Sequence, residues 1–172
     1  MYGLNGMLFR HQAPAGFAVT FRAVHDPHGQ PIVCGLSYAV RHYVYLGDDQ
    51  QNASYLWYCA SAPGKILTHY LTTHFGQPTS VEPREIGKIA LDLTIQESVQ
   101  GGYQGRMGLH ADPTGGAKLL SLYSQYGMTA RPNGSLPPTF IRTMLQGRGA
   151  KGYFYFDEAG ALSFSQSLTS WR

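Results

Sequence analysis

The apolar residues change their spacing along this chain, and that change constrains the fold more than any other feature. Up to Ser61 they alternate with other residues or run together, as in β-strands. After Pro63 they recur every three to four residues, as on one face of a helix. The first part therefore predicts three strands, at Phe17–Val24, Pro31–Leu46 and Ser54–Ser61.

The second part predicts helices with a short strand between them. The clearest helix runs from about Glu85 to Gln100, where apolar residues form one broad face and Gly101-Gly102 ends it. Asp112-Pro113 has the form of a helix start, and Gly127 that of the stop after the same helix. The expected elements are helices at Lys65–Phe75, Glu85–Gln100 and after Pro113, and a strand at Arg106–Ala111.

Three further segments complete the prediction. Residues 1–16 carry little pattern and predict an irregular arm, and 129–139 predict a loop. Gly152–Phe156 and Ala161–Ser165 flank Asp157-Glu158-Ala159-Gly160, which predicts a hairpin. The expected fold is one α+β (mixed α/β) domain over residues 1–172, with a mostly antiparallel central sheet flanked by helices.

The composition excludes several classes of protein. Of the 172 residues, 43% are hydrophobic and 13% charged, which is enough apolar material for a substantial core. The net charge of +3 is small and its basic residues are scattered, so the sequence lacks the basic cluster that is typical of proteins that bind nucleic acid. No apolar run approaches the roughly 20 residues of a membrane span, and the N-terminus does not resemble a signal peptide. We therefore expect a cytoplasmic protein without a membrane segment.

The two cysteines, Cys34 and Cys59, both lie in apolar runs that predict strands. We expect two buried thiols, although a disulfide between them stays open because sequence does not show their separation. The spacing of cysteines and histidines contains no metal-binding pattern of the CxxC type, so no metal is expected.

Three segments could carry chemistry. Arg84-Glu85-Ile86-Gly87 opens the long helix, where free backbone N–H groups and the helix dipole favour an anion, and a glycine lets it approach closely. In Gly105-Arg106-Met107-Gly108-Leu109-His110-Ala111, glycines lie on both sides of a strand and His110 could act as a base. In Tyr123-Ser124-Gln125-Tyr126-Gly127-Met128, the phenol of Tyr123 could donate a proton to a leaving group. Each segment also has an ordinary structural interpretation.

Taken together, the order of these segments resembles the coenzyme-A half of the GNAT superfamily of N-acetyltransferases. The resemblance covers roughly residues 54–128. Arg84 and Gly87 match the family's pyrophosphate loop, Arg/Gln-x-x-Gly-x-Gly/Ala, whereas Ile89 stands where the family usually has Gly or Ala.

The resemblance implies an acyl-CoA-dependent N-acetyltransferase that uses acetyl-CoA as co-substrate. It implies that the loop amides from Arg84 to Lys88 hold the phosphates, and that the strand backbone at Cys59, Ala60 and Ser61 holds the pantetheine and the thioester. Tyr123 would protonate the departing thiolate. The expected cofactor-binding residues are Cys59, Ala60, Ser61, Arg84, Glu85, Ile86, Gly87 and Lys88, with Tyr123 as the catalytic residue.

The acceptor side of the reaction stays open. The two helices that the family usually places between its first two strands have no room within His25–Gln30, and Tyr55–Ser61 contains no acidic residue to act as base. His69, His74 and Glu82 are candidate substitutes for the missing base.

The partners expected are acyl-CoA and an amine of a small molecule or a protein, and the exposed first and last strands could pair in a homodimer. The alternatives are a non-catalytic GNAT-like binding module that still binds CoA, and an effector that acylates a macromolecule.

Overall fold

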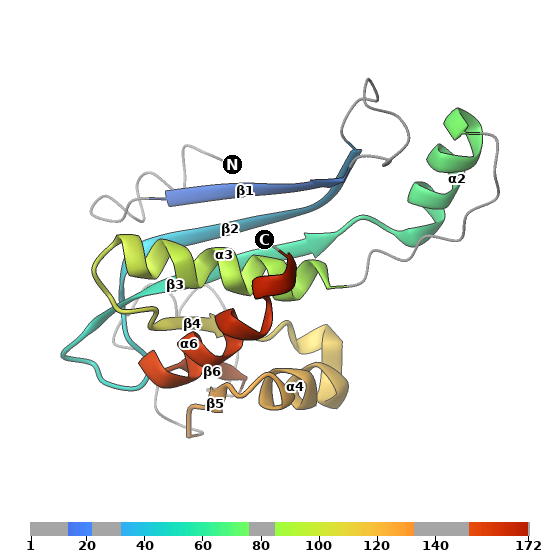
Figure 1. Ribbon diagram of the computed structural model, residues 1–172. Helices are drawn as coiled ribbons and strands as arrows, with labels where there is room; N and C mark the ends of the chain where they lie inside the picture. Colours follow the sequence, from blue (N-terminus) through green and yellow to red (C-terminus); the bar gives the residue numbers. More distant parts are fainter. Residues whose placement is uncertain (1–13, 22–31, 76–84, 133–151, 172) are drawn as a thin grey trace.

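The computed structural model describes residues 14–21, 32–75, 85–132 and 152–171, and its layers are visible in Figure 1. Six strands form one sheet in the order β1-β2-β3-β4-β6-β5. The strands are β1 (Pro14–Phe21), β2 (Ile32–Val44), β3 (Asn52–Ser61), β4 (Met107–His110), β5 (Thr129–Ala130) and β6 (Tyr153–Phe156). The helices are α2 (Gly64–Phe75), α3 (Ile86–Gln100), α4 (Gly116–Gln125) and α6 (Glu158–Ser167), with single 3₁₀ turns η1 (Pro113–Gly115) and η2 (Thr169–Trp171).

The sheet is mixed. Among the pairings between described strands, β3 with β4 is parallel and the other four are antiparallel. A parallel pair needs a crossover connection, which the helical segment from α2 to α3 provides. The prediction of an α+β fold with a mostly antiparallel sheet is therefore confirmed.

One face of the sheet is covered by α3 and α6, which lie in front of it in Figure 1. Their apolar side chains pack onto those of β3, β4 and β6. This helix-side core consists of Leu56, Leu91, Ile95, Met107, Leu109, Ala111, Met128, Phe154, Phe156, Ala161, Phe164 and Leu168, and Leu119, Tyr123 and Tyr126 pack at its border.

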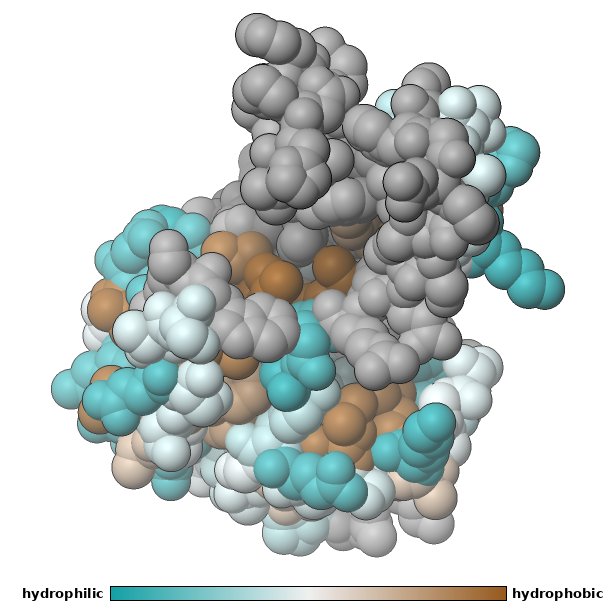
Figure 2. All heavy atoms as spheres, turned by 45° about the vertical axis from the view of Figure 1, so that its right-hand side comes forward, coloured by the Kyte–Doolittle hydropathy of each residue, from teal (hydrophilic) through white to brown (hydrophobic). Residues whose placement is uncertain are grey.

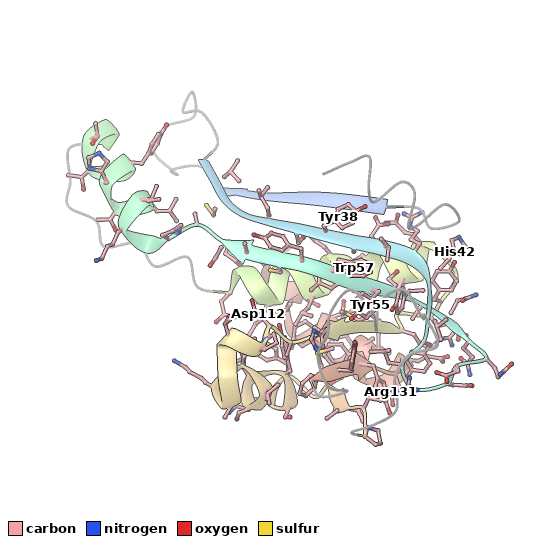
Figure 3. The ribbon with its side chains drawn as sticks, turned by 180° about the vertical axis from the view of Figure 1, so that it is seen from behind. Tyr38, His42, Tyr55, Trp57, Asp112 and Arg131 are labelled. Carbon is pink, nitrogen blue, oxygen red and sulfur yellow. The ribbon has the colours of Figure 1, made fainter. Side chains whose placement is uncertain are left out.

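The opposite face carries a second cluster, which is dominated by aromatic rings. Tyr43 and Tyr55 are almost fully buried and their ring centroids lie 4.3 Å apart. Figure 3 views the sheet from behind, the side opposite to α3, and labels Tyr38, Tyr55 and Trp57. We call this cluster the aromatic face; its members are Tyr38, Val40, Tyr43, Leu46, Tyr55, Trp57, Tyr153 and Tyr155.

The predicted hairpin at the end of the chain is wrong in its second half. Tyr153–Phe156 is a strand, but Glu158–Ser167 is the helix α6. The Asp157 side chain accepts a hydrogen bond from the Gly160 N–H, so it caps a helix where we expected a tight turn. Ala161, Phe164, Ser165 and Leu168 are buried, and their spacing of three and four residues is that of a helix face.

Two segments that were expected to be irregular contain strands. β1 begins at Pro14, inside the segment expected to be an irregular arm. Thr129–Ala130, expected in a loop, pairs as β5 with Tyr155 and Phe154 of β6. The expected turn at His25–Gln30 lies outside the described residues. In the part of the chain described, no helix has the length and apolar character needed to cross a membrane.

Candidate functional site

β3 continues past the point where its pairing with β4 stops. The pairs are Ser54 with Met107, Tyr55 with Gly108 and, last, Leu56 with Leu109. β4 ends at His110, whereas β3 runs on to Ser61 with only β2 beside it among the described strands. We call Trp57–Ser61 the β3 extension.

A β-bulge marks the start of the β3 extension. Tyr38 of β2 pairs with Tyr58 and the next residue, Ala39, pairs with Leu56, so Trp57 is the extra residue. A bulge increases the local twist and re-aims the strand that contains it. The bulge at Trp57 therefore lies at the point where the β3 extension leaves its neighbour β4.

The backbone of the β3 extension presents polar groups on the side of β4. The N–H of Ala62 donates to Cys34 O on β2 over 2.7 Å. Backbone groups alternate in direction along a strand, so those of Ser61 and Cys59 point away from β2. No described strand lies there to accept their N–H groups.

The start of α3 lies over the end of this extension. An added Cβ on Gly35, which pairs with Ser61, would collide with the Ile86 side chain, so the helix start approaches β2 as closely as glycine permits. The first N–H groups of a helix have no partner within it. A Cβ at Gly87, in contrast, would meet no atom of the described residues within 4 Å, so these residues leave the first turn open on that side.

The charges at this helix start are paired with each other. Lys88 Nζ lies 2.6 Å from Glu85 Oε2. Hydrogen bonding to Glu85 raises the pKa of Lys88, which therefore stays a cation at neutral pH. Glu85 has a left-handed backbone with φ of 71° and places a carboxylate where an anion would bind. Arg84, the residue expected to supply the main positive charge, lies outside the described residues.

Tyr123 lies on α4, at the border of the helix-side core. Its ring centroid is 5.4 Å from that of Phe154 on β6. Burial raises the pKa of Tyr123 to about 12, with smaller contributions from Cys59, Tyr126 and Asp112. The hydroxyl is therefore protonated throughout the neutral range, as a proton donor must be.

The contact between α4 and α3 connects the two halves of the site. Lys88 Nζ lies 5.5 Å from the ring centroid of Tyr126, one turn of helix after Tyr123. The start of α3 in turn lies over the β3 extension, because the Ile86 side chain packs against Gly35, the residue that pairs with Ser61. The described residues of the predicted site, from the β3 extension, the start of α3 and α4, thus lie at one end of the sheet.

Figure 2 views the end of the molecule that carries α2 and α4, and shows apolar surface between the polar side chains there. Ile66 on α2 and Leu120 and Leu122 on α4 are exposed. This end of the sheet thus combines backbone donors with apolar surface.

The exposure of Cys59 differs from the sequence prediction of a buried thiol. Cys34 is buried as expected, but Cys59 is exposed, and the two sulfur atoms do not form a disulfide. Its exposure follows from its place in the β3 extension, beyond the cover of β4. Partial desolvation raises the pKa of the Cys59 thiol, which keeps it protonated and poorly nucleophilic at neutral pH.

The candidate bases from the α2 region are not brought to this site by any described contact. His69 is exposed on α2, while the side chain of His74 and the whole of Glu82 lie outside the described residues. Within the described residues, no group of three or more His, Cys, Asp or Glu side chains could hold a metal ion.

Sequence reasoning missed the importance of Trp57 and Tyr126. The bulge at Trp57 has no sequence signal, because it depends on the register with β2. No local pattern singles out Tyr126, because its contact with Lys88 joins segments that are distant in sequence. Comparison of the chain with protein-family models, curated proteins and solved structures found no match.

Proposed function

We propose that this protein has a GNAT-like fold and transfers an acetyl or other acyl group from acyl-CoA to an amine. The observation that carries the proposal is the β3 extension. It offers outward-facing backbone donors next to a parallel strand that has ended, beneath the start of a helix. Such an arrangement suits a long, thin ligand that pairs with a strand edge and ends in phosphates.

The start of α3 supports the placement of the phosphates. Unsatisfied N–H groups and the positive end of the helix dipole favour an anion at this point. The open side of Gly87 leaves room for a phosphate to reach these amides. Lys88 supplies a cation there once its pairing with Glu85 is exchanged for the phosphate.

The β3 extension supports the placement of the pantetheine and the thioester. The N–H groups of Cys59 and Ser61 would donate to the ligand's amide and carbonyl oxygens. In the transition state one of these donors would stabilise the oxyanion that forms when the amine attacks the thioester carbonyl.

Tyr123 completes the transfer. The new N–C bond forms, and the C–S bond then breaks as the thiolate takes the proton of the Tyr123 hydroxyl. The nitrogen, which still carries one surplus proton, returns it to the phenolate. The raised pKa of Tyr123 keeps its hydroxyl protonated at neutral pH, so a proton is present when the thiolate leaves beside it.

Two measurements test the proposal. Calorimetric titration with acetyl-CoA should give saturable binding, and incubation with acetyl-CoA and a panel of primary amines should release free thiol and N-acetylated product. Absence of binding would refute the proposal. Binding without transfer to any amine or protein would support a non-catalytic module that has kept its CoA site.

A further inference from the structure

A thiol and a hydroxyl are neighbours on the face of the sheet that α3 covers. Ser37 of β2 pairs with Cys59 in the β3 extension. Residues directly opposite each other in an antiparallel pair carry their side chains on the same face, with Cβ atoms about 5 Å apart. That face is the one beneath α3, because a Cβ on Gly35, two residues before Ser37, would collide with the Ile86 side chain. Cys59 and Ser37 therefore lie on the side of the sheet where α3 begins.

The hydroxyl of Ser37 is buried without a partner. The residue is only 5% exposed, and its Oγ forms no hydrogen bond within the part of the chain that the structure describes. Buried hydroxyls are normally paired, because leaving one unpaired costs free energy. This hydroxyl thus marks a place where a further polar atom would be stabilised.

The thiol of Cys59 has the opposite exposure. It is exposed and forms no disulfide with Cys34, which is buried. In the proposed complex the backbone of Cys59 holds the thioester end of the ligand, so the sulfur of CoA arrives beside the Cys59 side chain. Two sulfur atoms placed together can exchange into a disulfide when one of them comes from a disulfide reagent.

We propose that Cys59 forms a reversible mixed disulfide with the pantetheine thiol of CoA, and that Ser37 donates a hydrogen bond to the reacting sulfur. The reagent is CoA disulfide, the oxidised form of the cofactor. This inference rests on the proposed function, because it uses the same acyl-CoA site. The adduct occupies that site and stops acyl transfer until a thiol reduces it.

The exchange balances in atoms and electrons. Cys59 gives its proton to solvent, and its thiolate attacks one sulfur of CoA disulfide. The bond between Cys59 Sγ and that sulfur forms as the S–S bond of the reagent breaks. The second CoA leaves as a thiolate and takes a proton from solvent. Cys59 is oxidised and the departing CoA is reduced, so the reagent itself is the oxidant.

Binding decides which disulfide reacts. Desolvation raises the pKa of the Cys59 thiol, which therefore exchanges slowly with a disulfide that does not bind to the protein. A bound CoA disulfide is held against the thiol, and such proximity raises the rate of a step that is otherwise bimolecular. The modification is therefore selective for CoA over other cellular disulfides.

The test follows adduct formation on the full chain by mass spectrometry, with CoA disulfide, pantetheine disulfide and glutathione disulfide at equal concentrations. CoA disulfide should modify Cys59 roughly tenfold or more faster than glutathione disulfide, and dithiothreitol should remove the adduct. Pantetheine disulfide, which has the thiol arm without the phosphates, should react at an intermediate rate. Saturating acetyl-CoA should slow the reaction with CoA disulfide, because both ligands need the same site.

Variants assign the sulfur and the hydroxyl. Cys59→Ser should form no adduct, whereas Cys34→Ser is the matched control and should react at the wild-type rate, because Cys34 is buried. Ser37→Ala should slow the reaction with CoA disulfide roughly threefold or more, the range of one lost hydrogen bond. Ser37→Thr keeps a hydroxyl and should restore most of the rate. Ser37→Ala should not lower the melting temperature, since it removes a buried hydroxyl that has no partner among the described residues.

The outcomes separate this inference from the proposed function. If neither acetyl-CoA nor CoA disulfide binds to wild-type protein, both fail. If acetyl-CoA binds but CoA disulfide reacts no faster than glutathione disulfide, or reacts at Cys34, the mixed disulfide at Cys59 is overturned alone. Selective reaction in a protein that acetylates no amine would support this inference and refute the transfer step. A wild-type rate in Ser37→Ala would overturn the role of Ser37.

Discussion

Lys88 at the start of α3 contacts Tyr126 at the end of α4, and its Nζ lies 5.5 Å from the centroid of the tyrosine ring. The two residues come from segments that are far apart in the sequence, and their contact brings α4, which carries the proposed acid Tyr123, to the helix start where we propose that the phosphates bind. The hydroxyl is protonated at neutral pH, since burial raises the pKa of Tyr123 to about 12.

Tyr123→Phe should lower kcat for acyl transfer by roughly 100-fold or more, because the leaving thiolate loses its proton donor. The affinity for acetyl-CoA should change little, since the ring and its packing on Phe154 remain. Tyr126→Phe is the matched control, because it removes a hydroxyl from the tyrosine at the C-terminal end of the same helix. Steady-state rates together with calorimetric affinities check this, and an unchanged kcat would remove Tyr123 from the mechanism.

The high pKa of Tyr123 also predicts how stability depends on pH. In the unfolded chain a tyrosine loses its proton near pH 10, whereas the folded protein keeps it until about pH 12. The folded state therefore binds more protons in this window, and stability falls as the pH rises from 10 to 12. Allowing for partial exposure, the loss is about 1–2 kcal/mol. Denaturant titrations at pH 9 and pH 11.5 should show a smaller loss for Tyr123→Phe than for wild type.

Gly87→Ala should separate binding from folding. The added methyl meets no atom within 4 Å in the part of the chain that the structure describes, and alanine is the better helix former, so stability should rise by up to about 1 kcal/mol. The same methyl should obstruct a phosphate at the first turn of α3, and the affinity for acetyl-CoA should fall. Calorimetry and urea denaturation measure the two effects. Equal affinity in the variant and wild type would show that no phosphate approaches this turn.

Glu85→Gln should strengthen the binding of acetyl-CoA. The change removes a negative charge from the helix start and frees Lys88 from its ion pair. Lys88→Gln should weaken binding, and both effects should shrink at high salt because exposed charges are screened. A glutamine variant that binds acetyl-CoA no better than wild type would contradict this charge arrangement.

Asp157→Ala tests the helical end of the chain. It removes the side-chain oxygen that accepts from the Gly160 N–H at the start of α6, which should cost about 1 kcal/mol of unfolding free energy. Asp157→Asn keeps a capping oxygen and should cost much less. Thermal or denaturant unfolding distinguishes them, and equal losses for both variants would argue against the cap.

The sequence predicted those elements whose signals are local. The alternation in β2 and the apolar face of α3, ended by Gly101, follow from a few neighbouring residues. The hairpin predicted at the end of the chain was wrong because Phe154 and Phe164 both belong to short apolar segments. Such segments fit a strand or a helix equally well. The spacing of Ala161, Phe164 and Leu168, together with the cap at Asp157, was the signal that could have corrected it.

The candidate site was predictable in its parts but not in its geometry. The anion site at Gly87 and the phenol of Tyr123 could be proposed from residue types and their order. The bulge at Trp57, the last pair between Leu56 and Leu109 and the contact of Lys88 with Tyr126 depend on register and packing between distant segments. No local pattern contains that information.

The central claim, that acyl-CoA pairs with the β3 extension, is tested most directly by hydrogen exchange of single backbone amides, followed by NMR with and without acetyl-CoA. The N–H groups of Cys59 and Ser61 should exchange markedly more slowly when acetyl-CoA is bound, because they then donate to the ligand. The N–H of Ala62, already bonded to Cys34 O, should change little. Unchanged exchange at Cys59 and Ser61 under saturating acetyl-CoA would contradict the account.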